Sequence, residues 1–174
     1  MGADTIISRA PDARFLVAHP AHFIALGFGS GLAPRAPGTF GTLAALAIYW
    51  ALEYYLAPLV IAFLAIPLFF LGIWACGVTG RDLGVADHGA MVWDEMVAFL
   101  PLAALASASV WMQLVAFALF RLFDIWKPFP IRQFDRQLKG GFGVMFDDLI
   151  AAAYAYLVII VLVAAGHAFL KAGP

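Results

Sequence analysis

Long apolar stretches separated by short polar segments dominate the chain. Two of them, Pro58–Gly77 and Leu149–Leu170, have no charged residue in their interiors, and each reaches the roughly 20 residues that a helix needs to cross a bilayer. A third stretch, Thr39–Ala57, carries a single charge, Glu53, near its end. The pattern predicts three helices that can each span a membrane.

A fourth apolar stretch, Met91–Phe123, is too long for one span and short for two, and it is broken near Ser107–Ser109. We interpret it as a tight hairpin of two helices, Met91–Ala106 and Val110–Phe123, with a single long tilted helix as the alternative. Under the first interpretation the chain is all-α, a polytopic membrane helix bundle of about five membrane-embedded helices. Its length, residues 1–174, is that of a single domain.

The composition supports a membrane protein rather than an ordinary soluble domain. Apolar residues make up 64% of the chain and charged residues only 12%, whereas a soluble domain is about half apolar and a quarter charged. A single cysteine, Cys76, excludes an intramolecular disulfide, and no cluster of cysteine and histidine indicates zinc.

The basic residues predict which side of the membrane the loops occupy. With five spans, all the lysines and arginines except Lys171 fall on one side: Arg9, Arg14, Arg35, Arg81, Arg121, Lys127, Arg132, Arg136 and Lys139. By the positive-inside rule, that side is cytoplasmic. Every acidic residue except Glu53 lies on or near the same side. Since the rule does not govern acidic residues, their gathering needs another cause.

The first candidate motif is the segment DHGAMVWDE, Asp87 to Glu95. Asp87 is placed to cap a helix, and on that helix Asp87 and Asp94 would lie nearly on one face, with Glu95 about 100° away. Asp94 and Glu95 precede an apolar run, where dehydrating a carboxylate is costly. Either they face a protein interior with a partner or a metal, or they mark the water boundary of the helix. The segment alone leaves both interpretations open.

The second motif, Arg121 to Ile131, contains Asp124 and Lys127, which are three residues apart and can share a helix face. Pro128 and Pro130 then end the helix. The alternative for this segment is an interfacial salt bridge, with Trp126 as a membrane anchor.

The third motif follows shortly afterwards. In GGFGVMFDD, a run of glycines that begins at Gly140 leads to Asp147 and Asp148, which open the last predicted span. One of the two aspartates can be an N-cap, but one cap residue suffices, so the other carboxylate requires a different explanation.

The fourth motif is the glycine- and proline-rich segment from Gly27 to Thr42. Its backbone N–H groups, Thr39 and Arg35 are suited to holding a phosphate or shaping a pocket wall. It is not a P-loop, because no Lys-Ser/Thr pair follows a suitably spaced glycine. An ordinary connecting loop remains the alternative.

Taken together, six carboxylates lie at cytoplasmic ends of predicted helices: Asp87, Asp94, Glu95, Asp124, Asp147 and Asp148. If the helices bundle, these groups converge and repel one another, so a cation must compensate. Oxygen ligands without cysteine or histidine favour a hard ion such as Mg²⁺, which suits a phosphate monoester. Five basic residues can supply positive charge for an anionic lipid headgroup: Arg35, Arg121, Lys127, Arg132 and Arg136.

The four motifs together resemble the phosphatidylglycerophosphatase A family of bacterial inner-membrane enzymes. The matching stretches are GFGSGLAPRAPGTFGT, DHGAMVWDE and FRLFDIWKPFPIRQFDRQLKGGFGVMFDD, in family order. The resemblance implies Mg²⁺-dependent conversion of phosphatidylglycerophosphate to phosphatidylglycerol and phosphate, in the synthesis of phosphatidylglycerol and cardiolipin. The sequence departs from the family pattern at Ala98, Thr42 and Ala152 or Ala153, which alters close packing and leaves the ionisable set intact.

The resulting hypothesis assigns a role to each candidate residue. Metal binding is assigned to Asp94, Glu95, Asp124, Asp147 and Asp148; catalysis to Asp87, Asp94 and Lys127; and substrate binding to Arg35, Thr39, Arg121, Arg132 and Arg136. Water and an aspartate remain alternatives as the group that attacks phosphorus. The expected partners are an anionic phospholipid substrate and membrane lipid, with no nucleic acid, and the oligomeric state stays open.

Two other classes of protein compete with this hypothesis. A small cation-binding membrane transporter would use the carboxylates as an ion site, but transport needs polar groups near mid-membrane, and the two most apolar stretches have no charge there. A non-catalytic membrane scaffold would leave the carboxylate cluster without a cause.

Overall fold

The computed structural model describes residues 10–106 and 109–171, and every regular element in these ranges is helical. The elements are α1 (Ala13–Ala18), α2 (Pro20–Ala25), the 3₁₀ helix η1 (Gly27–Leu32), α3 (Pro37–Glu53), α4 (Pro58–Leu83), α5 (Trp93–Ala106), α6 (Val110–Trp126), α7 (Ile131–Gln137) and α8 (Gly140–Lys171). The predicted all-α class is therefore confirmed. Arg9 and Ser107, which the sequence arguments used, lie outside the described residues.

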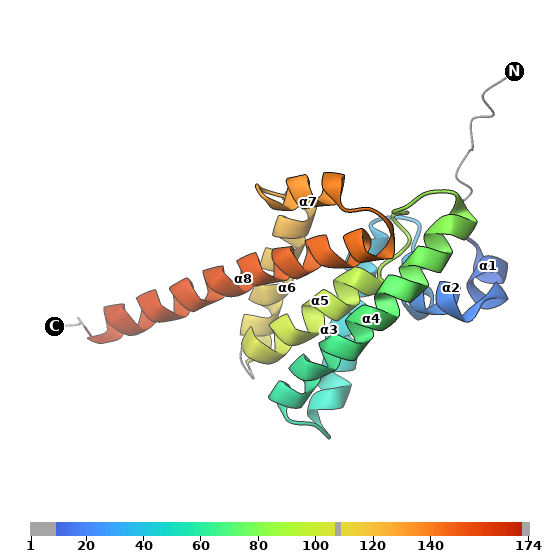
Figure 1. Cartoon of the computed structure of the whole chain (residues 1–174). Helices are drawn as coiled ribbons and strands as arrows, with labels where there is room; N and C mark the ends of the chain where they lie inside the picture. Colours follow the sequence, from blue (N-terminus) through green and yellow to red (C-terminus); the bar gives the residue numbers. More distant parts are fainter. Residues whose placement is uncertain (1–9, 107–108, 172–174) are drawn as a thin grey trace, which may run out of the picture.

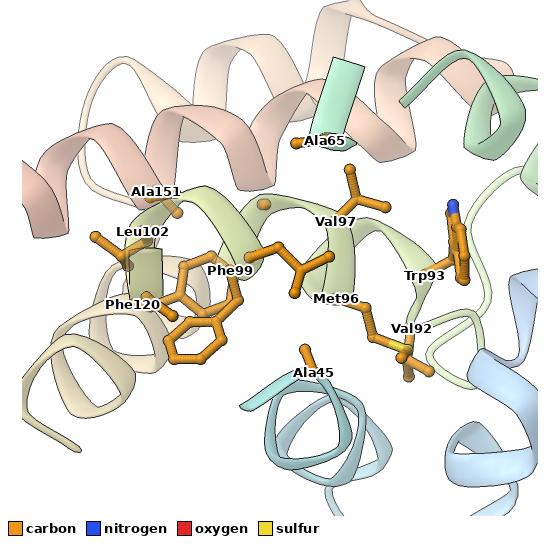
Figure 2. Close-up of a cluster of buried hydrophobic side chains, with 14 of the residues drawn as sticks. Ala45, Ala65, Val92, Trp93, Met96, Val97, Phe99, Leu102, Phe120 and Ala151 are labelled. Carbon is orange, nitrogen blue, oxygen red and sulfur yellow. The ribbon is translucent and has the colours of Figure 1, made fainter. Parts of the chain in front are cut away.

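Helix α5 is the centre of the bundle (Figure 1), and it packs against α3, α4, α6 and α8. Apart from Glu95, Pro101 and Leu105, all of its residues are buried. A helix that is apolar on all sides needs apolar surroundings, and the neighbouring helices supply them for α5. Figure 2 shows the result, in which Phe99 of α5 meets Phe120 of α6, with 5.8 Å between the ring centroids.

The predicted hairpin of two helices is confirmed. Helix α5 ends at Ala106, and α6 begins at Val110 after Ser109, whose backbone is extended (φ −78°, ψ 121°). The two helices contact each other, so the alternative of a single long tilted helix is wrong. The predicted break falls partly on residues 107 and 108, outside the described ranges.

Within the described residues, two helices are long and apolar enough to cross a membrane, Pro58–Leu83 and Gly140–Ala168. Only 28% and 22% of their apolar windows are buried inside the molecule, whereas the core helix of a soluble protein would be mostly buried. The two helices are compatible with membrane association. Helices α3, α5 and α6 have 17, 14 and 17 residues, so the predicted count of five spans is not confirmed.

The start of α8 differs from the predicted one. The helix begins at Gly140 rather than at Leu149, so Asp147 and Asp148 lie inside it and neither is an N-cap. The physical reason is close helix packing, since a Cβ on Gly141 would overlap the carbonyl of Ile73 in α4. Glycine disfavours helix as an isolated residue, but the tertiary contact overrides that preference.

The position of Asp87 is a second correction. Helix α5 begins at Trp93, so Asp87 lies in the preceding loop, neither capping that helix nor sharing a face with Asp94. The loop is tied to the N-terminal part of the chain instead, because the Val92 N–H donates to the Ala25 carbonyl of α2 at 2.9 Å.

Two of the departures from the family pattern lie in the contact between α5 and α8. Ala98 of α5 and Ala152 of α8 are buried where these helices meet, and with Ala153 they line a small apolar cavity of about 170 Å³. The hydroxyl of Thr42 donates to the Gly38 carbonyl at 2.9 Å, a hydrogen bond that serine could also make.

Candidate active site

Three carboxylates from three helices meet where the ends of α5 and α6 approach α8. Glu95 lies in the first turn of α5, Asp124 near the end of α6, and Asp148 in α8. One oxygen of each lies within 4.8 Å of the others. The convergence that the sequence predicted thus includes these three residues.

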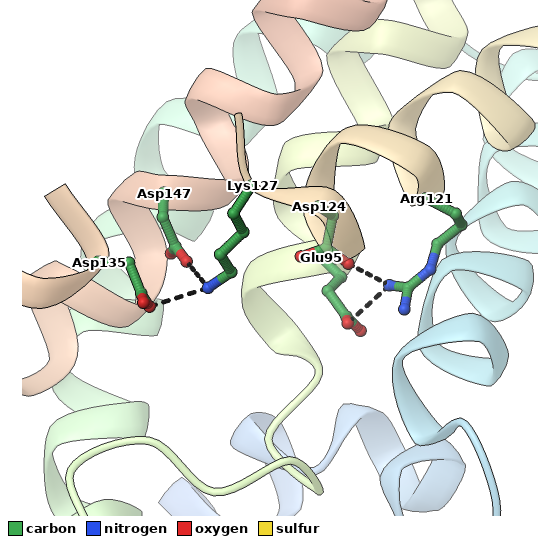
Figure 3. Close-up of polar contacts among 6 residues, drawn as sticks. All are labelled: Glu95, Arg121, Asp124, Lys127, Asp135 and Asp147. Carbon is green, nitrogen blue, oxygen red and sulfur yellow. Dashed lines mark hydrogen bonds and ion pairs between the residues drawn. The ribbon is translucent and has the colours of Figure 1, made fainter. Parts of the chain in front are cut away.

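Arg121 compensates part of this negative charge (Figure 3). Its Nη1 atom lies 2.7 Å from Glu95 Oε1 and 2.8 Å from Asp124 Oδ2. Its guanidinium thus holds two members of the acidic cluster, the group of Glu95, Asp124 and Asp148, in place. Substrate binding by Arg121 stays a prediction.

Three buried carboxylate oxygens at the site have no protein partner among the described residues. Glu95 Oε2, Asp148 Oδ2 and Asp94 Oδ1 are buried and accept no hydrogen bond there. A buried, unpaired carboxylate oxygen is costly, and an all-oxygen donor set is what Mg²⁺ prefers. These residues therefore fit a hard divalent cation, although metal binding itself stays a prediction.

The other two predicted metal ligands are placed differently. Asp94 is buried, with 8% of its surface exposed, and Asp147 is paired with Lys127. Neither belongs to the group of three oxygens described above. A metal site built on this geometry uses Glu95, Asp124 and Asp148 as its nearest carboxylates.

Lys127 points away from Asp124 and toward two other carboxylates (Figure 3). Its Nζ atom lies 2.8 Å from Asp135 Oδ1 and 2.5 Å from Asp147 Oδ2. Lys127 is the C-cap of α6 in a left-handed conformation (φ 44°), which turns the chain as it leaves the helix. The side chain does not share a helix face with Asp124, which pairs with Arg121 instead.

The charge of Lys127 is maintained by its partners. Partial burial lowers the pKa of the ammonium, but the hydrogen bonds to Asp135 and Asp147 outweigh that effect and hold the pKa above its ordinary value. The ammonium is therefore charged at physiological pH and able to contact an anion.

An open pocket of about 580 Å³ lies beside Lys127. Arg132 and Arg136 line it together with the exposed ring of Trp126, and Arg132 also donates to the Trp126 carbonyl at 3.2 Å. A smaller pocket of about 230 Å³ lies next to it, lined by Asp87, Asp135 and again Arg136. Lys127, Arg132, Arg136 and Asp87 thus all line pockets at this end of the bundle.

The glycine-rich segment forms a wall of the site through its backbone. Gly38 approaches Glu95 so closely that a Cβ there would overlap the carboxylate, and a Cβ on Gly41 would come within 3.2 Å of Glu95 Oε2. Thr39 is half-buried beside Gly38, whereas Arg35 is exposed on the loop before α3. The segment therefore contacts Glu95 through Gly38 and Gly41, and substrate binding by Arg35 and Thr39 stays a prediction.

Asp135 is a residue of this site that the sequence motifs did not indicate. It lies eight residues after Lys127 and is the only carboxylate in the basic stretch from Arg132 to Lys139. Among the described residues, Asp135 pairs with Lys127 and not with a cation of that stretch, so the sequence carried no signal for this contact, which depends on how α7 packs on α8.

Carboxylates gathered from three helices, beside a lysine and an arginine-lined pocket, are features of an all-helical enzyme that acts on an anionic phosphate ester. The family model described as Phosphatidylglycerophosphatase A matches residues 23–163. The chain belongs to this family of lipid phosphatases.

Curated relatives agree with the family assignment. The phosphatidylglycerophosphatase A of Haemophilus influenzae is 49% identical over 81% of this chain and 87% of its own length. That of Escherichia coli is 40% identical over 84% of this chain and 87% of its own length. A putative phosphatidylinositol-3-phosphatase of Bacteroides thetaiotaomicron is 42% identical over 79% of this chain and 90% of its own length. No solved structure matches the chain significantly.

Proposed function

We propose that the protein hydrolyses the terminal phosphate monoester of phosphatidylglycerophosphate to give phosphatidylglycerol and inorganic phosphate, and that it requires Mg²⁺. Family membership supports the reaction. The observation that carries the metal requirement is the group of oxygens from Glu95, Asp124 and Asp148 within 4.8 Å of one another, where two buried carboxylate atoms have no partner among the described residues.

In this proposal Glu95, Asp124 and Asp148 would hold the ion. When bound, Mg²⁺ would neutralise charge on the phosphate oxygens and help to orient the nucleophile. Arg121 keeps Glu95 and Asp124 together through its two short ion pairs. Because these two side chains are already ordered, binding of the ion would cost less conformational entropy.

The basic residues would bind and orient the substrate. Lys127 lies at the wall of the larger pocket as a compact charge with three donors. Arg132 and Arg136 line the same pocket and offer the planar guanidinium fork that suits phosphate. Arg35 and Thr39 are adjacent to the site wall at Gly38 and remain candidates for contacts to the headgroup.

Two acidic residues outside the group of three are assigned to proton transfer. Asp87 lines the smaller pocket, where its carboxylate can take a proton from an attacking water. Asp94 has one buried oxygen without a partner among the described residues, and a carboxyl group there can hold a proton or reinforce the metal site.

The membrane context follows from the charge distribution. We place the protein in the bacterial cytoplasmic membrane, with the acidic cluster and its pockets on the cytoplasmic side, because the lysines and arginines gather there in the sequence. The lipid substrate would keep its acyl chains in the bilayer and present its headgroup to the pocket beside Lys127. Its product would serve as the precursor of cardiolipin.

The test is phosphate release from detergent-solubilised phosphatidylglycerophosphate, with and without Mg²⁺. We expect turnover only with the metal. Glu95→Gln and Asp148→Asn should each lower kcat by about 100-fold or more, because even groups around a metal's ligands contribute 10–100-fold. The matched control is Glu53→Gln, at the other end of the 17-residue helix α3, about 24 Å from its start.

Two outcomes would contradict the proposal. Undiminished turnover with a chelator would remove the metal requirement, and unchanged kcat in both variants would remove the ligand assignment. Phosphatidylinositol 3-phosphate is included as a second lipid, since one relative is named for that substrate. Faster release from it would change the assigned headgroup.

A further inference from the structure

Asp135 makes a contact to the candidate site that the proposed function does not use. It lies in α7, and its carboxylate shares the ammonium of Lys127 with Asp147 of α8 (Figure 3). The three side chains are 35%, 25% and 7% exposed for Asp135, Lys127 and Asp147. The bridge therefore runs from the accessible surface of the site to its buried interior.

A lysine head needs partners to hold one position. Its ammonium carries three donors on a flexible four-carbon stem. The backbone of Lys127 at the end of α6 therefore does not by itself fix the position of the ammonium. The two carboxylates lie on different helices, and the ammonium is held between them. With Asp147 alone, the ammonium would be drawn toward the buried carboxylate.

The position of this bridge relates it to the substrate pocket. Lys127 lines the larger pocket, and Asp135 lines the smaller one beside Asp87. Arg136, the residue after Asp135, lines both pockets. Of the two partners of Lys127, Asp135 is the one that lines a pocket described above.

We propose that Asp135 is a positioning residue that holds the Lys127 ammonium where the substrate phosphate binds. This inference rests on the proposed function, because it takes Lys127 as the phosphate-contacting cation. Asp135 acts through Lys127 and makes no contact with the reacting atoms.

A purely structural role for Asp135 would be to attach α7 to the bundle. Helix α7 has other anchors for that purpose. Ile131 is fully buried, and the ring of Phe134 meets that of Phe146 in α8, with 5.5 Å between centroids. Loss of the carboxylate should therefore leave α7 packed, while the lysine loses one of its two partners.

The test compares Asp135→Asn and Asp135→Glu with the wild-type protein in detergent, using phosphatidylglycerophosphate as substrate and inorganic phosphate as inhibitor. For Asp135→Asn we expect kcat to fall about 10-fold, in line with the loss of one charge-assisted hydrogen bond. Inhibition by phosphate should weaken, and the melting temperature should change little. Asp135→Glu should restore kcat to within about 3-fold, because it keeps the charge.

The matched control is Asp82→Asn. Asp82 is also a partly exposed carboxylate in an ion pair, 2.7 Å from His22 Nε2, but it belongs neither to the acidic cluster nor to the pockets described above. Asp82→Asn should leave kcat and inhibition by phosphate unchanged. An equal fall of kcat in Asp135→Asn and Asp82→Asn would point to general destabilisation and overturn the inference.

A second measurement does not depend on turnover. Labelling with an amine-reactive reagent, followed by mass spectrometry, reports the release of Lys127 from its partners, with exposed Lys139 as the reference in the same digest. We expect faster labelling of Lys127 in Asp135→Asn only. Unchanged labelling, or unchanged kcat and phosphate inhibition in an active protein, would overturn the inference. If the wild-type protein releases no phosphate but Lys127 is labelled faster in Asp135→Asn, the result counts against the proposed function alone.

Discussion

Glu95 is the residue on which most constraints of the candidate site converge. One of its oxygens pairs with Arg121, the other has no partner among the described residues, and its carboxylate belongs to the group with Asp124 and Asp148. Gly38 of α3 lies directly against it. A side chain so enclosed has little freedom to adjust, so its neighbour must be glycine for steric reasons.

Gly38→Ala tests this close approach. The added Cβ would overlap the Glu95 carboxylate, and overpacking of this kind costs about 1–3 kcal/mol. Since the flexible carboxylate moves more easily than the backbone, we expect kcat to fall at least about 10-fold with a smaller loss of stability. Phosphate release and thermal unfolding are the measurements. Gly89→Ala is the control, because a Cβ there meets nothing within 4 Å, and equal kcat in both variants would contradict the argument.

At the scale of helices, the apolar pattern predicted those helices and breaks that the local sequence determines. The run Pro58–Gly77 lies within α4, and the break near Ser109 separates α5 from α6. The start of α8 could not be predicted, because Gly141 is explained by its close contact with α4, which the local sequence does not reveal. The position of Asp135 could not be predicted either, since its contact with Lys127 depends on how α7 packs on α8.

Gly141→Leu tests whether glycine sets the spacing of α4 and α8. Any side chain there would overlap the carbonyl of Ile73, so the helices must separate and the free energy of unfolding should fall by about 1–3 kcal/mol. Gly166→Ala is the control in the same helix. A Cβ at that position meets nothing within 4 Å, and alanine is favoured over glycine in a helix by about 1 kcal/mol.

Unfolding in detergent, followed by circular dichroism, measures both changes. Because the α4–α8 contact lies next to the segment that carries Asp147 and Asp148, activity should fall along with stability in Gly141→Leu. An unchanged unfolding midpoint for Gly141→Leu would show that the bundle accommodates a side chain at this contact.

At the scale of the whole molecule, polar and apolar surfaces are segregated. Helix α8 extends past the rest of the bundle (Figure 1), and Leu157, Ile160 and Val161 are exposed on it. Helix α4 exposes large apolar side chains such as Phe63 and Phe70. Leaving such surface in water costs about 25 cal/mol per Å². The acidic cluster and its pockets occupy the end of the bundle where α5 and α8 begin and α6 ends.

The segregation predicts the orientation of the protein in the bilayer. The turn between α3 and α4 carries Tyr55, which is 80% exposed, and Gln137 ends α7 at the larger pocket. If the basic end is cytoplasmic, a membrane-impermeant thiol reagent should label Tyr55→Cys on intact spheroplasts. It should label Gln137→Cys only after the membrane is opened. Native Cys76 is fully buried, so the unsubstituted protein should stay unlabelled. Labelling of Gln137→Cys on intact spheroplasts would place the site on the outer face and remove a cytoplasmic substrate from consideration.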